Sequence, residues 1–339
     1  VLVCGRRFIR LLRQKQVLEH TRRGDSERLD LLHATKGNTP TMGGLVMFGA
    51  VLISTLLWAR LEAPAVPVLL LSAIGLAGLG FADDLMKLRR KKGISARVKL
   101  GAQLGISLLA GAYLYADPLT VRHLALDGDG ATRLFLPFLH GVSFELGLGF
   151  ILLVAFVTTG ASNSVNLTDG LDGLATGCSL LVGSVLVAVA FASGDASTSA
   201  GLHLPHIPQA LEAAVFLSAL LGSGLGFLWF NCHPAEIFMG DTGALPLGGS
   251  LGLAAVILKQ ELLLVLVGGV LVAEALSVIL QVLSFKIRRK RIFLIAPLHH
   301  HFQFKGWSET KITVRFWIAG AILALVSVAA LHTSRGWLP

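Results

Sequence analysis

Charged residues are scarce in this chain: only 14% of its 339 residues are Asp, Glu, Lys or Arg, whereas 54% are hydrophobic. A soluble domain usually carries about 25% charged residues, so water is not the main solvent around this protein. Cysteine is also rare. Cys4, Cys178 and Cys232 stand far apart without a C-x-x-C pair, which indicates neither a disulfide framework nor a zinc site. The sequence shows no internal repeat.

Long apolar runs take the place of charge. A transmembrane helix needs about 20 mainly apolar residues. Nine stretches are candidates: 42–60, 65–82, 98–116, 148–165, 173–193, 211–229, 243–258, 262–284 and 314–332. Backbone groups in lipid must be satisfied within their own element, so runs of helical length predict a helix bundle and not a barrel. We therefore expect an all-α polytopic membrane protein, a bundle of about nine helices, with residues 1–339 forming a single integral-membrane domain.

The positive charge is asymmetric. If the loops alternate between the two sides, 24 of the 29 Lys and Arg residues fall on one side, and the positive-inside rule makes that side cytoplasmic. It includes a basic segment at 1–41 and a loop at 285–313, in which 285–295 mixes apolar and basic residues as an interfacial helix does. Anionic lipid headgroups account for such charge, and nucleic acid is not required. Because Val1–Gly5 read like the tail of an apolar segment, we expect a further span before them.

Acidic residues gather on the same side. Asp83 and Asp84 end an apolar run beside several lysines and arginines, and adjacent carboxylates are tolerated where a divalent cation or basic groups compensate them. They are also compatible with an ordinary helix end. Asp169 and Asp172 lie in N-L-T-D-G-L-D-G, where a turn with a helix N-cap explains Asp172 alone but not the whole set.

The segment F-N-C-H-P-A-E-I-F-M-G-D-T-G places Asp241 between glycines just before an apolar helix. A carboxylate there suits either a helix N-cap or a magnesium ligand, and Phe238 three residues earlier could stack on a base. His299, His300 and His301 are consecutive and therefore point in different directions, which favours phosphate contacts over one zinc ion. Glu274 interrupts an apolar stretch, where either a functional role or a hydrogen bond between helices would explain it.

Together these segments resemble the phospho-N-acetylmuramoyl-pentapeptide transferases, bacterial enzymes of the polyprenyl-phosphate N-acetylhexosamine-1-phosphate transferase superfamily. The resemblance runs from about residue 6 to 332 through N-T-P-T-M-G-G at 38–44, F-A-D-D-L-M-K at 81–87, N-L-T-D-G-L-D-G-L-A at 166–175, F-N-C-H-P-A-E-I-F-M-G-D at 230–241 and A-P-L-H-H-H-F-Q-F-K-G-W at 296–307. Each motif is short, but five in this order are specific. The resemblance implies ten spans, and we expect the nine found here to be the second to the tenth.

The resemblance implies that undecaprenyl phosphate attacks the β-phosphate of UDP-N-acetylmuramoyl-pentapeptide, which yields lipid I and UMP for peptidoglycan synthesis with Mg²⁺ as cofactor. It implies a multi-pass protein of the bacterial inner membrane with its active site at the cytoplasmic face. Asp83 matches a proposed base, Asp84 its neighbour, and Asp241 the metal ligand, while His299, His300 and His301 match the triple-His loop. The implied substrate-binding residues are Lys36, Thr41, Lys87, Lys91, Lys99, Asn166, Asp169, Asp172, Asn231, Phe238 and Gly240. Whether the protein forms a homodimer is left open.

Two other functions compete. A sister enzyme that transfers N-acetylglucosamine 1-phosphate from its UDP donor to polyprenyl phosphate would share the acidic motifs, but P-L-H-H-H-F-Q-F-K-G-W favours the muramoyl-pentapeptide enzyme. A transporter would place polar breaks near the bilayer midplane and carry internal repeats. Here the polar motifs fall at one membrane face.

The charge asymmetry makes a direct prediction about topology. In a chain whose native cysteines are replaced, Ser95→Cys is expected to react with a membrane-impermeant thiol reagent only from the cytoplasm. Asp127→Cys is expected to react only from outside. The reversed labelling pattern would overturn the orientation.

Overall fold

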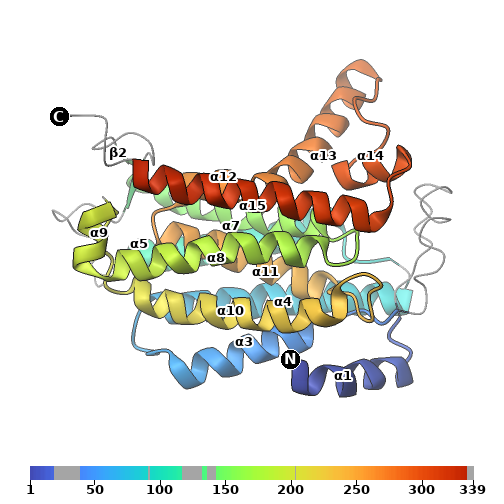
Figure 1. The fold of residues 1–339 in the computed structure, drawn as a ribbon, viewed down its shortest axis with the longest axis horizontal. Helices are drawn as coiled ribbons and strands as arrows, with labels where there is room; N and C mark the ends of the chain where they lie inside the picture. Colours follow the sequence, from blue (N-terminus) through green and yellow to red (C-terminus); the bar gives the residue numbers. More distant parts are fainter. Residues whose placement is uncertain (19–38, 91, 117–131, 136–142, 203, 334–339) are drawn as a thin grey trace.

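The computed structural model describes residues 1–339 except 19–38, 91, 117–131, 136–142, 203 and 334–339, so Lys36, Lys91 and Asp127 lie outside the described residues. The described part contains thirteen helices and one antiparallel pair of short strands (Figure 1). The helices are α1 (Leu2–Gln14), α3 (Gly44–Trp58), α4 (Ala65–Arg90), α5 (Ala96–Ala116), α7 (Gly149–Thr168), α8 (Leu174–Gly194), α9 (Ala196–Leu202), α10 (Ala210–Asn231), α11 (Asp241–Ile257), α12 (Glu261–Val267), α13 (Gly269–Arg288), α14 (Leu298–Phe304) and α15 (Glu309–Thr333). The strands are β1 (Arg133–Phe135) and β2 (Ser143–Glu145). The predicted all-α class is confirmed.

Each of the nine apolar stretches is helical. Six of the helices are long and apolar enough to cross a membrane, namely α4, α7, α8, α10, α13 and α15, and α3 and α11 are shorter apolar helices. The stretch 262–284 differs from the expectation, because it is divided into α12 and α13 at Gly268, whose backbone (φ −85°, ψ 14°) is not helical. Two consecutive glycines at 268–269 have low helix propensity and make this break inexpensive. The chain is a multi-pass membrane protein.

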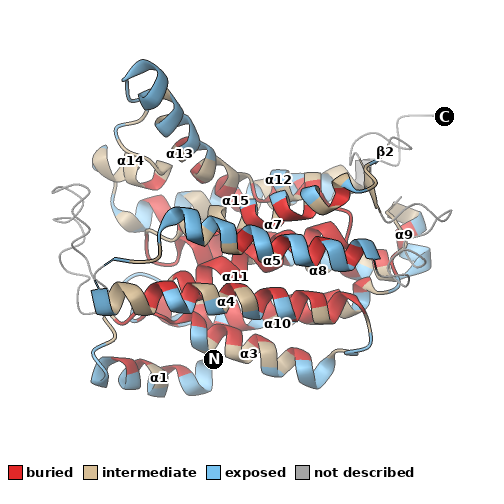
Figure 2. Ribbon diagram, turned by 180° about the vertical axis from the view of Figure 1, so that it is seen from behind, coloured by how far each residue is buried: buried red, intermediate tan, exposed pale blue. Residues whose placement is uncertain are grey.

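The helix α11 forms the centre of the bundle. All 17 of its residues are buried, and it packs against α4 and α7 over most of its length (Figure 2). Small residues make this close approach possible. A Cβ atom added to Gly80 of α4 would lie 2.1 Å from the carbonyl oxygen of Asp241, and one added to Gly44 of α3 would lie 2.2 Å from the backbone nitrogen of Gly243. Glycine at such contacts lets helix backbones meet, as is common in membranes.

Polar side chains join α5 to α7 inside the bundle. Gln103 donates to the hydroxyl of Ser162 (3.0 Å) and accepts from the amide of Asn163 (3.0 Å). The Ser162 hydroxyl in turn donates to the carbonyl of Leu245 in α11 (2.9 Å). Because residues four apart lie on one face of a helix, these bonds also fix the direction of Lys99, one turn before Gln103.

The polar motifs meet at one end of the bundle. The last turn of α4, the first turns of α5 and α11, the α7–α8 loop, α14 and the start of α15 lie at this end, whereas α9 and β2 lie at the opposite end (Figure 1). We call the end that carries the polar motifs the site end, and the opposite end, with α9 and β2, the far end. The sequence-based alternation of loops placed Asp83, Asp169, Asp241 and His299 on one side, and the structure has them at the site end.

The prediction of an interfacial helix at 285–295 is wrong in its extent. The helix α13 ends at Arg288, and Arg289 adopts a left-handed backbone (φ 56°). The side chain of Gln281 then accepts from the N–H groups of Ile292 (3.0 Å) and Phe293 (3.0 Å), which turns the chain back along α13. These backbone groups obtain their partners from a side chain and not from a continued helix. The end of α13 still projects from the bundle (Figure 2), with Ile287 71% exposed.

The packing around α11 predicts that alanine substitutions at two glycines of α4 differ sharply in their effect on thermal stability. Gly80→Ala forces a Cβ against backbone atoms of α11, and overpacking of this kind costs about 1–3 kcal/mol or more. We expect a clear fall in the thermal unfolding temperature of the purified protein in detergent. Gly78→Ala is the matched control, since nothing lies within 4 Å of a Cβ at that position. Equal melting of the two variants would contradict the described packing.

Candidate active site

The side chain of Asp84 caps the start of α11 from a neighbouring helix. Its Oδ1 atom accepts from the backbone N–H of Asp241 (3.1 Å), and its Oδ2 atom accepts from the N–H (2.9 Å) and the hydroxyl (2.7 Å) of Thr242. The N-cap residue of α11 is Gly240, which has a positive φ of 69° and offers no side chain. A Cβ there would lie 2.5 Å from Asp84 Oδ2. Asp84 therefore supplies the capping acceptors that helix N-termini require, and Asp241 itself is not an N-cap.

Three carboxylates and two lysines meet at this point. Oxygen atoms of Asp83, Asp84 and Asp241 lie within 4.8 Å of one another, and all three residues are buried. Lys87 Nζ lies 2.8 Å from Asp83 Oδ2 and 3.0 Å from Asp241 Oδ2. Lys99 forms ion pairs with the same two oxygen atoms. With all five groups ionised, the two ammonium groups leave one negative charge uncompensated.

The donor set fits a divalent cation that prefers oxygen ligands. Both oxygen atoms of Asp84 are occupied by the start of α11, and Asp83 Oδ1 accepts from the N–H of Ile94 (2.5 Å). Asp241 and Asp83 Oδ2 are then the carboxylate groups that face the two lysines. Magnesium is typically held by one or two protein carboxylates together with phosphate oxygens. The cluster offers that number of carboxylates, and lysines in the same place can take up phosphate.

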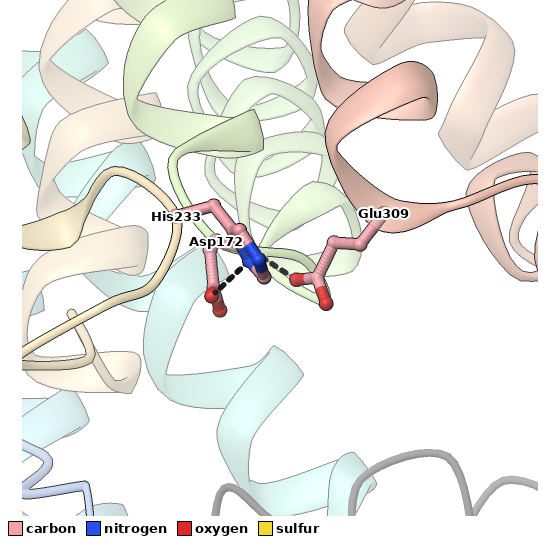
Figure 3. Close-up of side chains that lie close together, drawn as sticks. All are labelled: Asp172, His233 and Glu309. Carbon is pink, nitrogen blue, oxygen red and sulfur yellow. Dashed lines mark hydrogen bonds and ion pairs between the residues drawn. The ribbon is translucent and has the colours of Figure 1, made fainter.

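A second cluster ties three loops together (Figure 3). Asp172 Oδ2 lies 3.0 Å from His233 Nδ1 and accepts from the N–H of Ala235 (3.1 Å). The backbone N–H of Asp172 donates to Glu309 Oε1 (2.7 Å). Asp172 belongs to the α7–α8 loop, His233 to the α10–α11 loop, and Glu309 begins α15. Asp172 is therefore not the N-cap of α8, which is Gly173. It connects the loop before α11 to the loop before α8.

The three histidines diverge, as their consecutive positions predicted. His299 is buried against the α7–α8 loop, where a Cβ on Gly170 would lie 2.3 Å from its Nε2 atom. His300 Nδ1 lies 2.7 Å from Gln303 Oε1. His301 Nδ1 accepts from the N–H of Leu294 (3.1 Å), which requires the neutral ring, and burial together with nearby Lys305 holds the pKa of His301 below its usual value.

The remaining candidates line the loop before α11 or lie close to it. The Asn231 side chain donates to the carbonyl of Ile237 (3.0 Å) and accepts from the hydroxyl of Thr176 (3.0 Å), so it holds this loop in place. The N–H of Phe238 donates to the carbonyl of Pro40 (2.8 Å), four residues before α3 begins at Gly44. Thr41 is buried beside Gly240, and Asn166 and Asp169 close the C-terminal end of α7.

Several residues of this end were missed or left undecided at the level of sequence. Thr242 and Ile94 contribute mainly backbone groups, which no motif identifies. His233 stands inside a recognised polar segment but had no role, and Glu309 carried no signal at all. Glu274 was left open between a functional role and a hydrogen bond between helices; in the structure its carboxylate contacts His299 of α14.

Comparison with known proteins agrees with this picture. The family model described as glycosyl transferase family 4 matches residues 66–259. The chain is 49% identical over 303 residues to a phospho-N-acetylmuramoyl-pentapeptide-transferase of Leptospira biflexa, which covers 88% of this chain and 82% of that protein. Proteins of the same name from Koribacter versatilis and Methylacidiphilum infernorum are 44% and 47% identical, each over 97% of this chain and 89% of their own length.

The capping contact predicts a structural role for Asp84 that can be separated from chemistry. Asp84→Ala leaves three buried donors without an acceptor, and each such group costs about 1–3 kcal/mol. We expect a lower thermal unfolding temperature even without substrate. Thr242→Val removes one of the three bonds and is expected to cause a clearly smaller decrease. Wild-type stability of Asp84→Ala would show that α11 does not depend on this cap.

Proposed function

The chain belongs to the phospho-N-acetylmuramoyl-pentapeptide-transferase family, and we propose that it transfers phospho-N-acetylmuramoyl-pentapeptide from its UDP-linked donor to undecaprenyl phosphate. The products are lipid I and UMP. The observation that carries this proposal is the meeting of Asp83, Asp241, Lys87 and Lys99 at one end of a membrane helix bundle. Such a cluster suits a reaction between a soluble diphosphate and a phosphate fixed in the bilayer. We treat residues 1–339 as one transferase domain.

The alternatives are less well supported. The family model alone does not separate this activity from transfer of N-acetylglucosamine 1-phosphate, but the three relatives carry the muramoyl-pentapeptide name along most of the chain. A transporter is disfavoured because the cluster of carboxylates and lysines lies at one end of the bundle and not at its midplane. The positive charge around the site end supports a cytoplasmic active site in the bacterial inner membrane.

Phosphoryl transfer depends mainly on positioning and on neutralising charge at the phosphate oxygens. We assign Asp241, with Asp83 beside it, to a magnesium ion, which when bound supplies positive charge to the reacting phosphates. Lys87 and Lys99 hold the carboxylates in the free protein, and they can donate to phosphate oxygens once substrates arrive. Asp84 keeps Asp241 in place through the backbone of α11.

A strong general base is not needed at this site. A phosphate monoester with a second pKa near 6 is largely ionised at neutral pH, so the lipid phosphate already carries its attacking oxygen as an anion. Asp83 therefore contributes charge and position more than proton removal. This assignment agrees with its contacts, because one oxygen accepts a backbone N–H and the other meets two ammonium groups.

The nucleotide end of the donor is assigned to the neighbouring loops. Phe238 lies three residues before Asp241, and an aromatic ring there can stack on uracil, a contact worth about 1–3 kcal/mol. Asn166 and Asp169 at the end of α7 and Thr41 beside Gly240 complete this side. The triple-His loop faces the same end and supplies donors for phosphate or sugar oxygens.

One assay separates the candidate functions. The purified full chain is incubated with lipid phosphate and magnesium, together with either UDP-N-acetylmuramoyl-pentapeptide or UDP-N-acetylglucosamine, and UMP release is measured. We expect UMP only from the muramoyl-pentapeptide donor. UMP from the N-acetylglucosamine donor alone would identify the sister enzyme, and none from either donor would contradict a transferase.

The same assay tests the assignment of Asp241. Asp241→Asn keeps the side-chain shape and the backbone N–H that Asp84 binds, but it removes the anionic ligand. We expect normal membrane insertion and thermal stability with kcat lower by ~10²–10⁴-fold, the loss associated with several kcal/mol of electrostatic stabilisation. Asp195→Asn makes the same chemical change at an exposed position of the far end and should leave kcat unaltered. Activity of Asp241→Asn within about threefold of wild type, less than 1 kcal/mol of barrier, would rule out a metal role.

A further inference from the structure

We propose that Glu274 is the positioning residue for His299, and that this buried pair aims one ring nitrogen of His299 at the loop that carries Asp169 and Asp172. The inference rests on the proposed function, since it assigns His299 to the transferase site. It identifies Glu274 as a residue that acts on the reaction through another side chain.

The burial of Glu274 requires a partner. It lies in α13 within an apolar stretch, and its relative exposure is 0%. A carboxylate inside a membrane helix is costly unless a polar or charged group meets it. Both of its oxygen atoms meet His299: Oε1 accepts from the backbone N–H of His299 (3.1 Å), and Oε2 lies 3.1 Å from Nδ1. His299 is itself only 1% exposed.

These contacts fix the position of His299. Oε2 lies at ion-pair distance from Nδ1 without the alignment of a hydrogen bond, and a carboxylate oxygen, which can only accept, favours a proton on the nitrogen beside it. The backbone contact holds the first turn of α14, because His299 is the second residue of that helix. Glu274 thus restrains the ring at two points, and the remaining nitrogen, Nε2, is directed away from α13.

The direction of Nε2 is defined by Gly170. A Cβ on Gly170 would lie 2.3 Å from Nε2 and 3.0 Å from Cε1, so any other residue at position 170 would displace the ring. Gly170 stands between Asp169 and Asp172, which are assigned to the donor substrate. Nε2 therefore faces the stretch of backbone whose neighbours hold the nucleotide-sugar.

The other two histidines form local hydrogen bonds. His300 and His301 make local contacts with Gln303 and with the backbone of Leu294, three and seven residues away. The link from Glu274 to His299 spans 25 residues and joins α14 to a membrane helix. Among the three histidines, His299 is the one held by a buried carboxylate and set against the α7–α8 loop.

The test uses Glu274→Gln in the full chain. Glutamine keeps the size of the side chain and an acceptor for the His299 N–H, but it removes the charge opposite Nδ1. We expect kcat for UMP release to fall roughly 10- to 100-fold, as when a partner that orients a functional histidine is lost. The donor KM should stay within about threefold, because the base-stacking residues are unchanged.

A double-variant comparison distinguishes positioning from a general defect. If Glu274 acts through His299, the Glu274→Gln, His299→Gln double variant is no slower than His299→Gln alone, since residues that act as a unit are not additive. Glu261→Gln is the matched control, a second buried glutamate at the opposite end of α11 from Asp241, and its kcat should equal that of wild type. Losses that multiply in the double variant, or unchanged kcat in Glu274→Gln, would overturn the proposal.

Two further measurements keep the proposal testable if Glu274→Gln does not fold or if the wild type releases no UMP. Gly170→Ala displaces the same ring from the other side and should lower kcat to a similar extent. In protein labelled with ¹⁵N-histidine, NMR should detect one slowly exchanging Nδ1-bound proton that is missing from His299→Gln and present in Glu261→Gln. An inactive wild type with this proton would refute the proposed function alone. An active wild type that lacks this Nδ1-bound proton would refute the role of Glu274.

Discussion

The hydrogen bonds from the first turn of α11 to Asp84 are the contacts on which the site depends most. They attach a fully buried helix to the site end of α4, and they do so through backbone N–H groups, so Asp241 keeps its own carboxylate available. This arrangement requires glycine at 240, where a side chain would strike Asp84, and at 80, where one would strike the Asp241 carbonyl. The Asp241 carboxylate is thereby placed by the packing of a buried helix.

Charge compensation explains how three buried carboxylates remain together at the site end. Like charges this close would each favour protonation, but Lys87 and Lys99 reach the same oxygen atoms from α4 and α5. Lys99 is held in turn by the polar contacts between α5 and α7. The same lysines suit substrate phosphates, so the groups that stabilise the free site can also receive the reactants.

The α7–α8 loop is fixed on two sides by contacts with distant segments. On one side, Asp172 binds the loop that leads to α11 and the first residue of α15. On the other, Gly170 contacts the ring of His299, which Glu274 holds from α13. This side of the candidate site is therefore assembled from segments far apart in sequence.

The sequence alone determined the apolar helices and the end at which polar residues gather, and it marked Asp83, Asp84 and Asp241 as candidate site residues, because apolar length, charge asymmetry and short motifs are local properties. It predicted neither the break at Gly268 nor the end of α13 at Arg288, where two glycines and a distant Gln281 side chain decided the backbone. The segment around Asp241 was compatible with a helix cap or a metal ligand, and the family resemblance favoured the ligand. The structure gave the capping role to Asp84, 157 residues earlier, paired Glu274 with His299, and joined Asp172 to Glu309 across 137 residues. Contacts over such separations depend on how the helices pack, and no spacing within a single segment encodes them.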